Sequence, residues 1–154
     1  MKALERLRKW LTPYRVPQHS NIEFEDPIFG HCRYFPSSHQ WTTKRQMVGQ
    51  GDFLLSGRSE RPTPQQISLW KETQTRLPEL VKVAIESLPK PMTDEPCDLE
   101  HIKSSLTLRE VWLQPDCEVV MIFDTAAQIM CGNYEIAPVV VYKDWKIISS
   151  AWEP

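Results

Sequence analysis

The chain has 154 residues with 41% hydrophobic and 25% charged side chains, a composition typical of a globular protein that buries its own core. Its formal net charge of −2 argues against a nucleic-acid partner, because nucleic-acid-binding domains normally carry a basic excess. Only 5 glycines accompany 13 prolines, which disfavours glycine-rich loops that cradle phosphate groups. We therefore predict a single domain over residues 1–154 without a nucleic-acid partner.

Four cysteines lie far apart in the sequence, and none forms a C-x-x-C pair. They are Cys32, Cys97, Cys117 and Cys131. The N-terminal sequence MKALERLRKWL places charges where a signal peptide needs an unbroken apolar segment. No apolar run approaches the roughly 18 residues of a membrane span. We expect reduced cysteines, a cytoplasmic location and no membrane span.

Residues 1–12 contain the first predicted element. Leu4, Leu7 and Leu11 recur at helical spacing, and Pro13 ends the pattern. The pattern predicts a short amphipathic helix that packs on its own domain. Binding of this helix to a membrane surface or to a partner is the alternative, because basic residues occupy much of its other side.

A first β run is predicted over residues 21–57. NIEFE (21–25) alternates in polarity, and IFGHCRYF (28–35) and QWTTKRQMV (40–48) are joined by the turn-prone PSSH. GQGD (49–52) is a second turn, followed by FLLSG (53–57). The pattern is that of an antiparallel meander of four strands.

A long helix is predicted over residues 63–88. Thr63 suits the N-cap, Pro64 suits the first helical position, and Gln66 completes a capping box with Thr63. Apolar residues then recur at helical spacing as far as Leu88. Pro78 removes a backbone donor and crowds the preceding turn, so it should kink this helix or split it in two.

A proline-rich acidic connection, 89–104, leads to a second β run over residues 105–152. The run contains the strand patterns SLTLREVWL (105–113), CEVVMIFDT (117–125), NYEIAPVVVY (133–142) and KIISSAW (146–152). The order of the elements predicts an α+β fold. Two meander-like runs should form an antiparallel sheet packed against one long kinked helix, with a short N-terminal helix alongside.

Short segments between residues 22 and 148 carry a further signal. They are DPIFGHCRYFPSSHQW, GDFLLSG, PTPQQISLWKE and VVMIFDTAAQIMCGNYEIAPVVVYKDWKI, with Phe29, Gly30, Trp41, Asp124, Gly132 and Asp144 as the matching positions. Together they resemble a group of small bacterial α+β domains of unknown function, some of which are regarded as candidate toxin-immunity proteins. The resemblance implies toxin neutralisation. Trp145 departs from it, because the group usually has glycine there, as a type I′ turn prefers.

The stretch GHCRYFPSSH (30–39) holds two histidines and a cysteine, which are common metal ligands. In a strand, His31 and Cys32 point to opposite faces because the side-chain period is two. A hairpin closed at PSSH places His39 opposite Pro36 at the tip, about 17 Å from His31 at ~3.3 Å per residue. The stretch therefore predicts a hairpin without a metal site. Its core face should hold Cys32, Ile28 and Tyr34, and its other face His31 and Arg33.

Other patterns provide no catalytic residues. Asp124-Thr125 ends an apolar strand without the second carboxylate that a metal-dependent phosphotransferase needs. Gly49-Gln-Gly51 lacks the lysine and the following helix of a phosphate loop, and no G-x-S-x-G nucleophile elbow occurs. We expect no metal and no cofactor, and we favour a non-catalytic protein. An enzyme assembled from residues scattered along the sequence stays open.

Exposed acidic and aromatic residues are the remaining candidates for a partner-binding site. They are Asp94, Glu95, Asp98, Glu100, Trp145 and Trp152. Acidic residues steer basic partners, and tryptophan is enriched at interface hot spots. The leading hypothesis is a non-catalytic bacterial protein-binding domain, an immunity protein that neutralises a toxin, with a homodimer left open. The alternative is a small-molecule-binding domain or enzyme with a pocket between sheet and helix, lined by His31, Arg33 and Trp70.

Overall fold

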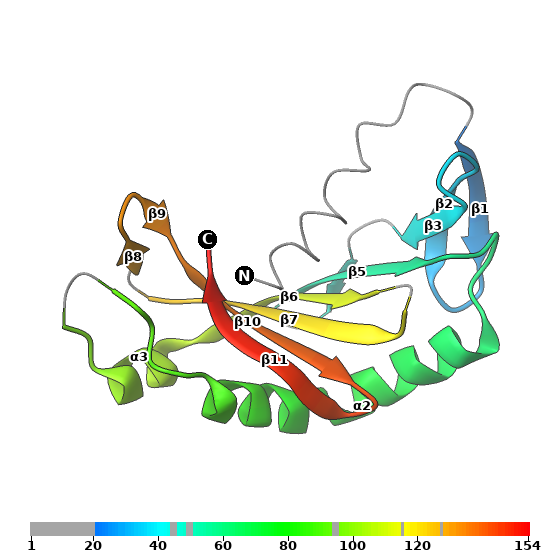
Figure 1. The fold of residues 1–154 in the computed structure, drawn as a ribbon. Helices are drawn as coiled ribbons and strands as arrows, with labels where there is room; N and C mark the ends of the chain where they lie inside the picture. Colours follow the sequence, from blue (N-terminus) through cyan, green and yellow to red (C-terminus); the bar gives the residue numbers. More distant parts are fainter. Residues whose placement is uncertain (1–20, 44–45, 49–50, 94–95, 115, 127) are drawn as a thin grey trace.

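The computed structural model describes residues 21–43, 46–48, 51–93, 96–114, 116–126 and 128–154. Within these residues, nine strands form one mixed sheet, a small two-stranded sheet stands apart, and two helices are present (Figure 1). The strand order of the large sheet is β1-β2-β3-β5-β6-β7-β10-β11, with β4 paired to β5. The predicted α+β class is confirmed, whereas the predicted N-terminal helix (1–12) lies outside the described residues.

The first β run comprises β1 (Ile22–Asp26), β2 (Gly30–Phe35), β3 (Gln40–Thr43), β4 (Gln46–Val48) and β5 (Gly51–Gly57). β2 and β3 pair in the register predicted from the PSSH turn, with Phe35 opposite Gln40 and Cys32 opposite Thr43. The predicted single strand 40–48 is wrong. β3 pairs with the end of β5 and β4 with its beginning, because β5 is long enough to take two short strands in succession.

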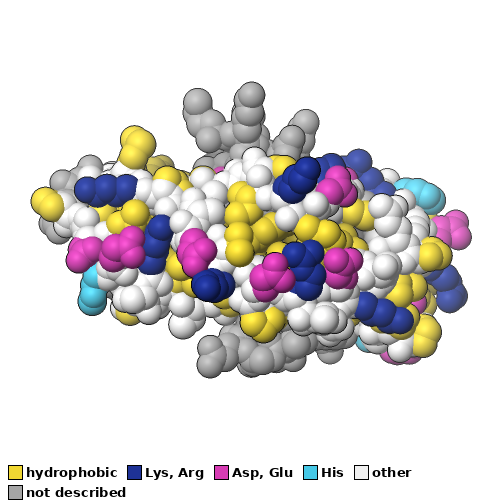
Figure 2. Space-filling model, turned by 90° about the horizontal axis from the view of Figure 1, so that it is seen from below, with side chains coloured by type: hydrophobic (Ala, Val, Ile, Leu, Met, Phe, Trp, Pro, Cys, Tyr) yellow, Lys and Arg dark blue, Asp and Glu magenta, His cyan; other side chains and the backbone are white. Residues whose placement is uncertain are grey.

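The helix α2 (Pro64–Ser87) covers one face of the sheet (Figure 1). Thr63 and Gln66 form the predicted capping box. The helix continues through Pro78, so the predicted split is wrong, while the kink stays a prediction. Burial of Trp70 before Pro78 and of Leu80 after it holds both halves on the sheet. Figure 2 shows acidic and basic side chains mixed along this side of the molecule, as expected for the outer side of a surface helix.

One parallel strand pair corrects the prediction of an antiparallel sheet. β5 pairs in parallel with β6 (Thr107–Leu113), and the chain between them runs through α2 and α3 (Leu99–Ser105). This long connection carries the chain back to the end of the sheet at which β5 began, so β6 runs in the direction of β5. The two predicted β runs therefore join at one parallel pair into a single mixed sheet.

The second β run contains β6, β7 (Glu118–Asp124), β10 (Ala137–Lys143) and β11 (Lys146–Glu153), paired antiparallel in that order. β10 begins later than the predicted strand 133–142, because β8 (Met130–Cys131) and β9 (Tyr134–Glu135) form a separate hairpin. The turn between β10 and β11 has positive φ at both Asp144 and Trp145, 48° and 60°. This is the sign pattern of a type I′ turn, although Trp145 is not glycine.

Both faces of the central strands are buried. On the α2 face, the Tyr142 hydroxyl donates a hydrogen bond to the Leu80 carbonyl at 2.7 Å. On the opposite face, which we call the second face, a smaller apolar cluster contains Val120, Ile122, Val139 and Val141, with Trp112 packed against it. β7 contributes side chains to both faces, which explains its continuous apolar run VVMIF.

Candidate functional site

His31 and Arg33 lie together on the outer face of β2, as the strand period predicts. Nδ1 of His31 is 2.8 Å from the Glu25 carboxylate, and the Arg33 guanidinium donates to Glu23 at 3.0 Å across the β1–β2 pair. Trp70 belongs instead to the buried core beneath α2. The three residues of the predicted pocket between sheet and helix therefore do not meet.

The other face of the same hairpin is packed. Cys32 and Tyr34 are buried as predicted, whereas Ile28 is exposed because it lies in the turn before β2. Burial raises the pKa of the Cys32 thiol to about 12, which suppresses the thiolate that a nucleophile requires. The Tyr34 hydroxyl lies 2.7 Å from Nδ1 of His39, so this histidine is part of the hairpin packing.

The structure describes two of the four acidic partner-binding candidates, Asp98 and Glu100. Asp94 and Glu95 lie outside the described residues. The Asp98 carboxylate accepts hydrogen bonds from the backbone N–H groups of Glu100 and His101 at 3.1 and 3.3 Å, so it caps α3. Glu100 is exposed in the first turn of α3, where a carboxylate is favoured by the helix dipole. Asp98 and Glu100 therefore have local roles in α3.

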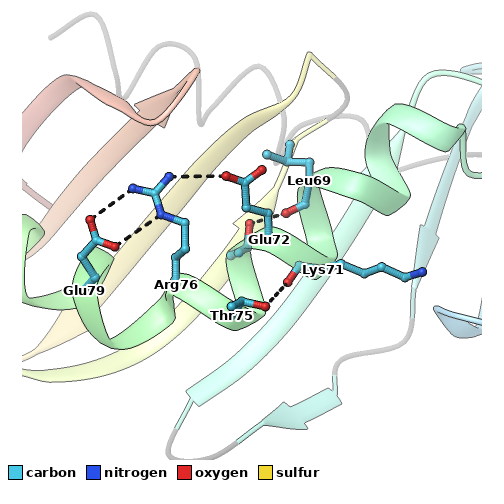
Figure 3. A network of polar contacts seen from close by, with 7 residues as sticks. Leu69, Lys71, Glu72, Thr75, Arg76 and Glu79 are labelled. Carbon is cyan, nitrogen blue, oxygen red and sulfur yellow. Dashed lines mark hydrogen bonds and ion pairs between the residues drawn. The ribbon is translucent and has the colours of Figure 1, made fainter.

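Trp145 and Trp152 are partly buried, and both contact α2 or the residues that follow it. The indole N–H of Trp152 donates to the Pro89 carbonyl at 2.7 Å. The Trp145 ring lies 4.8 Å from the guanidinium carbon of Arg76, which is held between two glutamates of α2 (Figure 3). These contacts fasten the C-terminal hairpin to α2.

A pocket of about 410 Å³ lies at one end of the second face, on the side of the sheet opposite α2. Strands β6, β7, β10 and β11 and the end of the β8–β9 hairpin supply its walls. Its charged and large aromatic lining residues include Arg109, Glu110, Trp112, Asp124, Glu135 and Glu153. None of these was predicted as a site residue from the sequence, in which Asp124 is the end of an apolar strand and a matching position of the resemblance.

Glu153 is buried in the wall of this pocket, with 5% of its surface exposed. Its pairing with Ala137 places its side chain on the face that carries Val139 and Ile122. Burial raises the pKa of this carboxyl group. The Oε2 atom is buried and has no hydrogen-bond partner among the described residues. The desolvation of this oxygen is therefore not compensated by the described part of the chain.

Other polar groups of the pocket are bonded to one another. Nη1 of Arg109 donates to Asp124 at 3.1 Å, and its Nε lies 3.7 Å from the Glu110 carboxylate. The Trp112 indole N–H also donates to Glu110, at 2.6 Å. The described lining presents four carboxylates, those of Glu110, Asp124, Glu135 and Glu153, against one guanidinium. The pocket therefore attracts positive charge.

The β8–β9 hairpin projects away from the large sheet (Figure 1), and the residues at its end line the pocket. Glu135 and Ile136, at the end of the hairpin, line the pocket, and the Ile136 amide donates to the Ile129 carbonyl at 2.8 Å. Met130 and Tyr134 are 42% and 67% exposed on the hairpin. Methionine and tyrosine are enriched at protein interfaces. The pocket and the hairpin together form one candidate binding surface.

The lining residues of the pocket are mainly carboxylates and apolar side chains, and the described ones include no cysteine, histidine, lysine or tyrosine. Across the described part of the chain, no three His, Cys, Asp or Glu side chains are grouped as a metal ion would need. None of the described helices is long and apolar enough to cross a membrane.

Sequence reasoning missed Glu153 because its surroundings depend on strand pairing. The alternation in KIISSAWE does place Ser149, Ala151 and Glu153 on one face of β11, away from Trp152. That this face meets the buried second face follows only from the β7–β10–β11 register. The strand period was therefore the available signal, and it was not sufficient.

Comparison of the chain with protein-family models, with curated protein sequences and with solved structures finds no match. The resemblance to bacterial immunity-type domains stays an expectation from the sequence. The pocket and the hairpin beside it are the features of the described structure that bear on function.

Proposed function

We propose that the chain is a non-catalytic binding domain that holds another protein at the acidic pocket and the β8–β9 hairpin. The observation that carries this proposal is the position of exposed Met130 and Tyr134 beside a pocket with an excess of carboxylates. Such side chains supply contact area at hot spots, while the carboxylates favour a partner with a basic surface.

An immunity role in the bacterial cytoplasm is the setting that the sequence resemblance implies. A toxin that acts on nucleic acid carries a basic cleft, because it binds a polyanion. An acidic surface on the immunity protein opposes such a cleft and steers the association of the two proteins. The proposal needs no cofactor.

Co-expression with the product of the neighbouring gene tests this role. We expect a complex that survives size-exclusion chromatography and that relieves growth arrest caused by that product. Met130→Ala and Tyr134→Ala should each weaken the complex about tenfold or more, as truncation of an interface hot spot does. Val83→Ala is the matched control, because Val83 is 40% exposed on α2, on the opposite side of the sheet.

One outcome would reject the immunity role, and another would change the identity of the partner. If no complex forms and no toxicity is relieved, the immunity role is rejected. If sedimentation shows a dimer of this chain that Tyr134→Ala dissociates, the hairpin is the interface of a homodimer, and the partner is a second copy.

A small organic cation is the second candidate ligand, and the size of the pocket favours it. The volume of about 410 Å³ lies within the roughly 300–1,000 Å³ of small-molecule sites. This pocket lies on the second face and not between sheet and helix. In a thermal-shift screen, organic amines that bind the pocket should raise the melting temperature of the protein.

A further inference from the structure

Glu153 occupies the end of β11, where the second face meets the pocket. Ala137 lies opposite it on β10, and the apolar side chains of Val139 and Ile122 line the same pocket. Apolar surroundings lower the local dielectric constant and strengthen the attraction between a carboxylate and a cation. The position therefore favours ion pairing more than an exposed glutamate would.

The described cation of the pocket is engaged elsewhere. The Arg109 guanidinium donates to Asp124 at 3.1 Å and lies 3.7 Å from Glu110. Oε2 of Glu153 has no hydrogen-bond partner among the described residues, although 95% of the residue is removed from solvent. A buried carboxylate oxygen in this state favours a ligand that donates hydrogen bonds and carries positive charge.

On the same face of the sheet, the buried carboxylate of Glu118 is paired with a cation. Its exposure is also 5%, but its Oε1 lies 3.5 Å from Nζ of Lys143. β10 ends with this lysine opposite Glu118, whereas the same strand begins with Ala137 opposite Glu153. The strand that supplies a cation at one end of the second face supplies only a methyl group at the other.

We infer that the pocket binds a guanidinium or ammonium group of a polypeptide, with Glu153 as its carboxylate partner. The inference deepens the proposed function, on which it rests for the existence of a protein partner. Two sources provide this chemistry. One is an arginine or lysine of the partner. The other is this chain's own N-terminal segment, which contains Lys2, Arg6, Arg8, Lys9 and Arg15.

Titration of the full chain with N-acetyl-arginine amide, followed by two-dimensional 1H–15N NMR, tests the inference. We expect saturable shifts of the Trp112 indole resonance and of the backbone amides of Ile136 and Glu153. N-acetyl-citrulline amide has nearly the same shape without the charge, and it should bind at least about tenfold more weakly. Equal affinity for the two probes would overturn the inference.

Two charge-removing variants supply a matched comparison. Glu153→Gln preserves the size of the side chain and should weaken binding of the arginine probe at least about tenfold, because the ion pair is lost. Glu118→Gln removes an equally buried carboxylate outside the pocket and should leave the affinity unchanged. Melting temperatures establish that both variants are folded. An unchanged affinity in Glu153→Gln would overturn the inference.

Replacement of the five N-terminal cations by alanine in the full-length chain distinguishes the two sources. If one of these cations fills the pocket, the probe should bind at least about tenfold more tightly after replacement. If a partner supplies the cation, the affinity should stay the same. Absence of saturable binding in both chains would overturn the inference. Failure of the proposed function is a separate result, because the probe needs no partner and a partner can bind through Met130 and Tyr134 alone.

Discussion

The two ends of the second face carry buried carboxylates with contrasting surroundings. At one end, Glu118 of β7 pairs with Lys143 of β10, and at the other, Glu153 of β11 lines a pocket with one oxygen unpartnered among the described residues. Both residues are 5% exposed, so burial does not distinguish them. The difference is whether the neighbouring strand provides a cation. It teaches that a buried carboxylate points to a ligand only when the fold leaves its charge uncompensated.

The largest effect on stability should come from removing the cation beside Glu118, so that this carboxylate resembles Glu153. Lys143→Met removes the cation beside Glu118 while retaining most of the apolar side chain. We expect the free energy of unfolding to fall by about 2 kcal/mol. This is less than for a fully buried pair, because the Lys143 side chain is 45% exposed and solvent screens the interaction. Urea denaturation followed by tryptophan fluorescence measures the change, and an unaltered midpoint would contradict the role of this ion pair.

Glu118→Gln should destabilise the protein by a smaller amount, about 1 kcal/mol, since the remaining Lys143 is free to turn into solvent. The double variant with Lys143→Met should lose less than the sum of the two single losses, because both changes remove the same interaction. A double-mutant cycle in urea measures this coupling. Strict additivity would show that the two side chains do not interact in solution.

Glu153→Gln should stabilise the protein at pH 7, whereas the two preceding variants should destabilise it. Because folding raises the pKa of Glu153, the folded chain holds this proton more tightly than the unfolded chain does. The stabilisation that the protonated Glu153 gives to the folded chain is therefore present below the ordinary glutamate pKa. It is lost as the pH rises through the raised pKa of the folded chain. We therefore expect the glutamine variant to gain about 1 kcal/mol at pH 7, with the gain shrinking toward ~pH 4.

Urea denaturation of Glu153→Gln across this pH range checks the prediction, with Glu118→Gln as the control for a paired carboxylate. A loss of stability at pH 7 would mean that the folded chain already supplies Glu153 with a partner. In that case, the contrast between the two ends of the second face would disappear.

Trp112→Phe should have the smallest effect, a loss of about 0.5–1 kcal/mol. The change removes the indole donor that bonds to Glu110 at 2.6 Å, while the ring still packs against the apolar cluster of the second face. Thermal unfolding measures the loss. A loss as large as that of Lys143→Met would mean that the polar network of Arg109, Asp124 and Glu110 is itself a structural element comparable with the Glu118 pair.

Features that depend on neighbouring residues could be predicted from the sequence. The Thr63–Gln66 capping box was predicted and is present, and the Asp98 cap of α3 is a local feature of the same kind. The strand period separated Cys32 from His31 correctly. In each case, the interacting groups are a few residues apart, so that backbone geometry alone fixes their relation.

Most of the candidate site could not be predicted in this way. Trp145 and Trp152 were expected to be exposed, but the fold brings α2 and Pro89 against them. The structure does not bring His31, Arg33 and Trp70 together, because the strand β2 places His31 and Arg33 on its outer face while Trp70 is buried in the core. Exposure and proximity are properties of the assembled sheet, which local patterns do not contain.

The α+β class, the start of α2 and the β2–β3 register could be predicted from the residue pattern, because the order of the elements, the cap residues and the turn residues specify them. The parallel pairing of β5 with β6 and the pocket at one end of the second face depend instead on contacts between residues far apart in the sequence. Glu118 lies beside Lys143, which is 25 residues away in the sequence, whereas Glu153 lies opposite Ala137. Whether a buried charge is compensated is decided by long-range strand pairing, which local patterns do not specify.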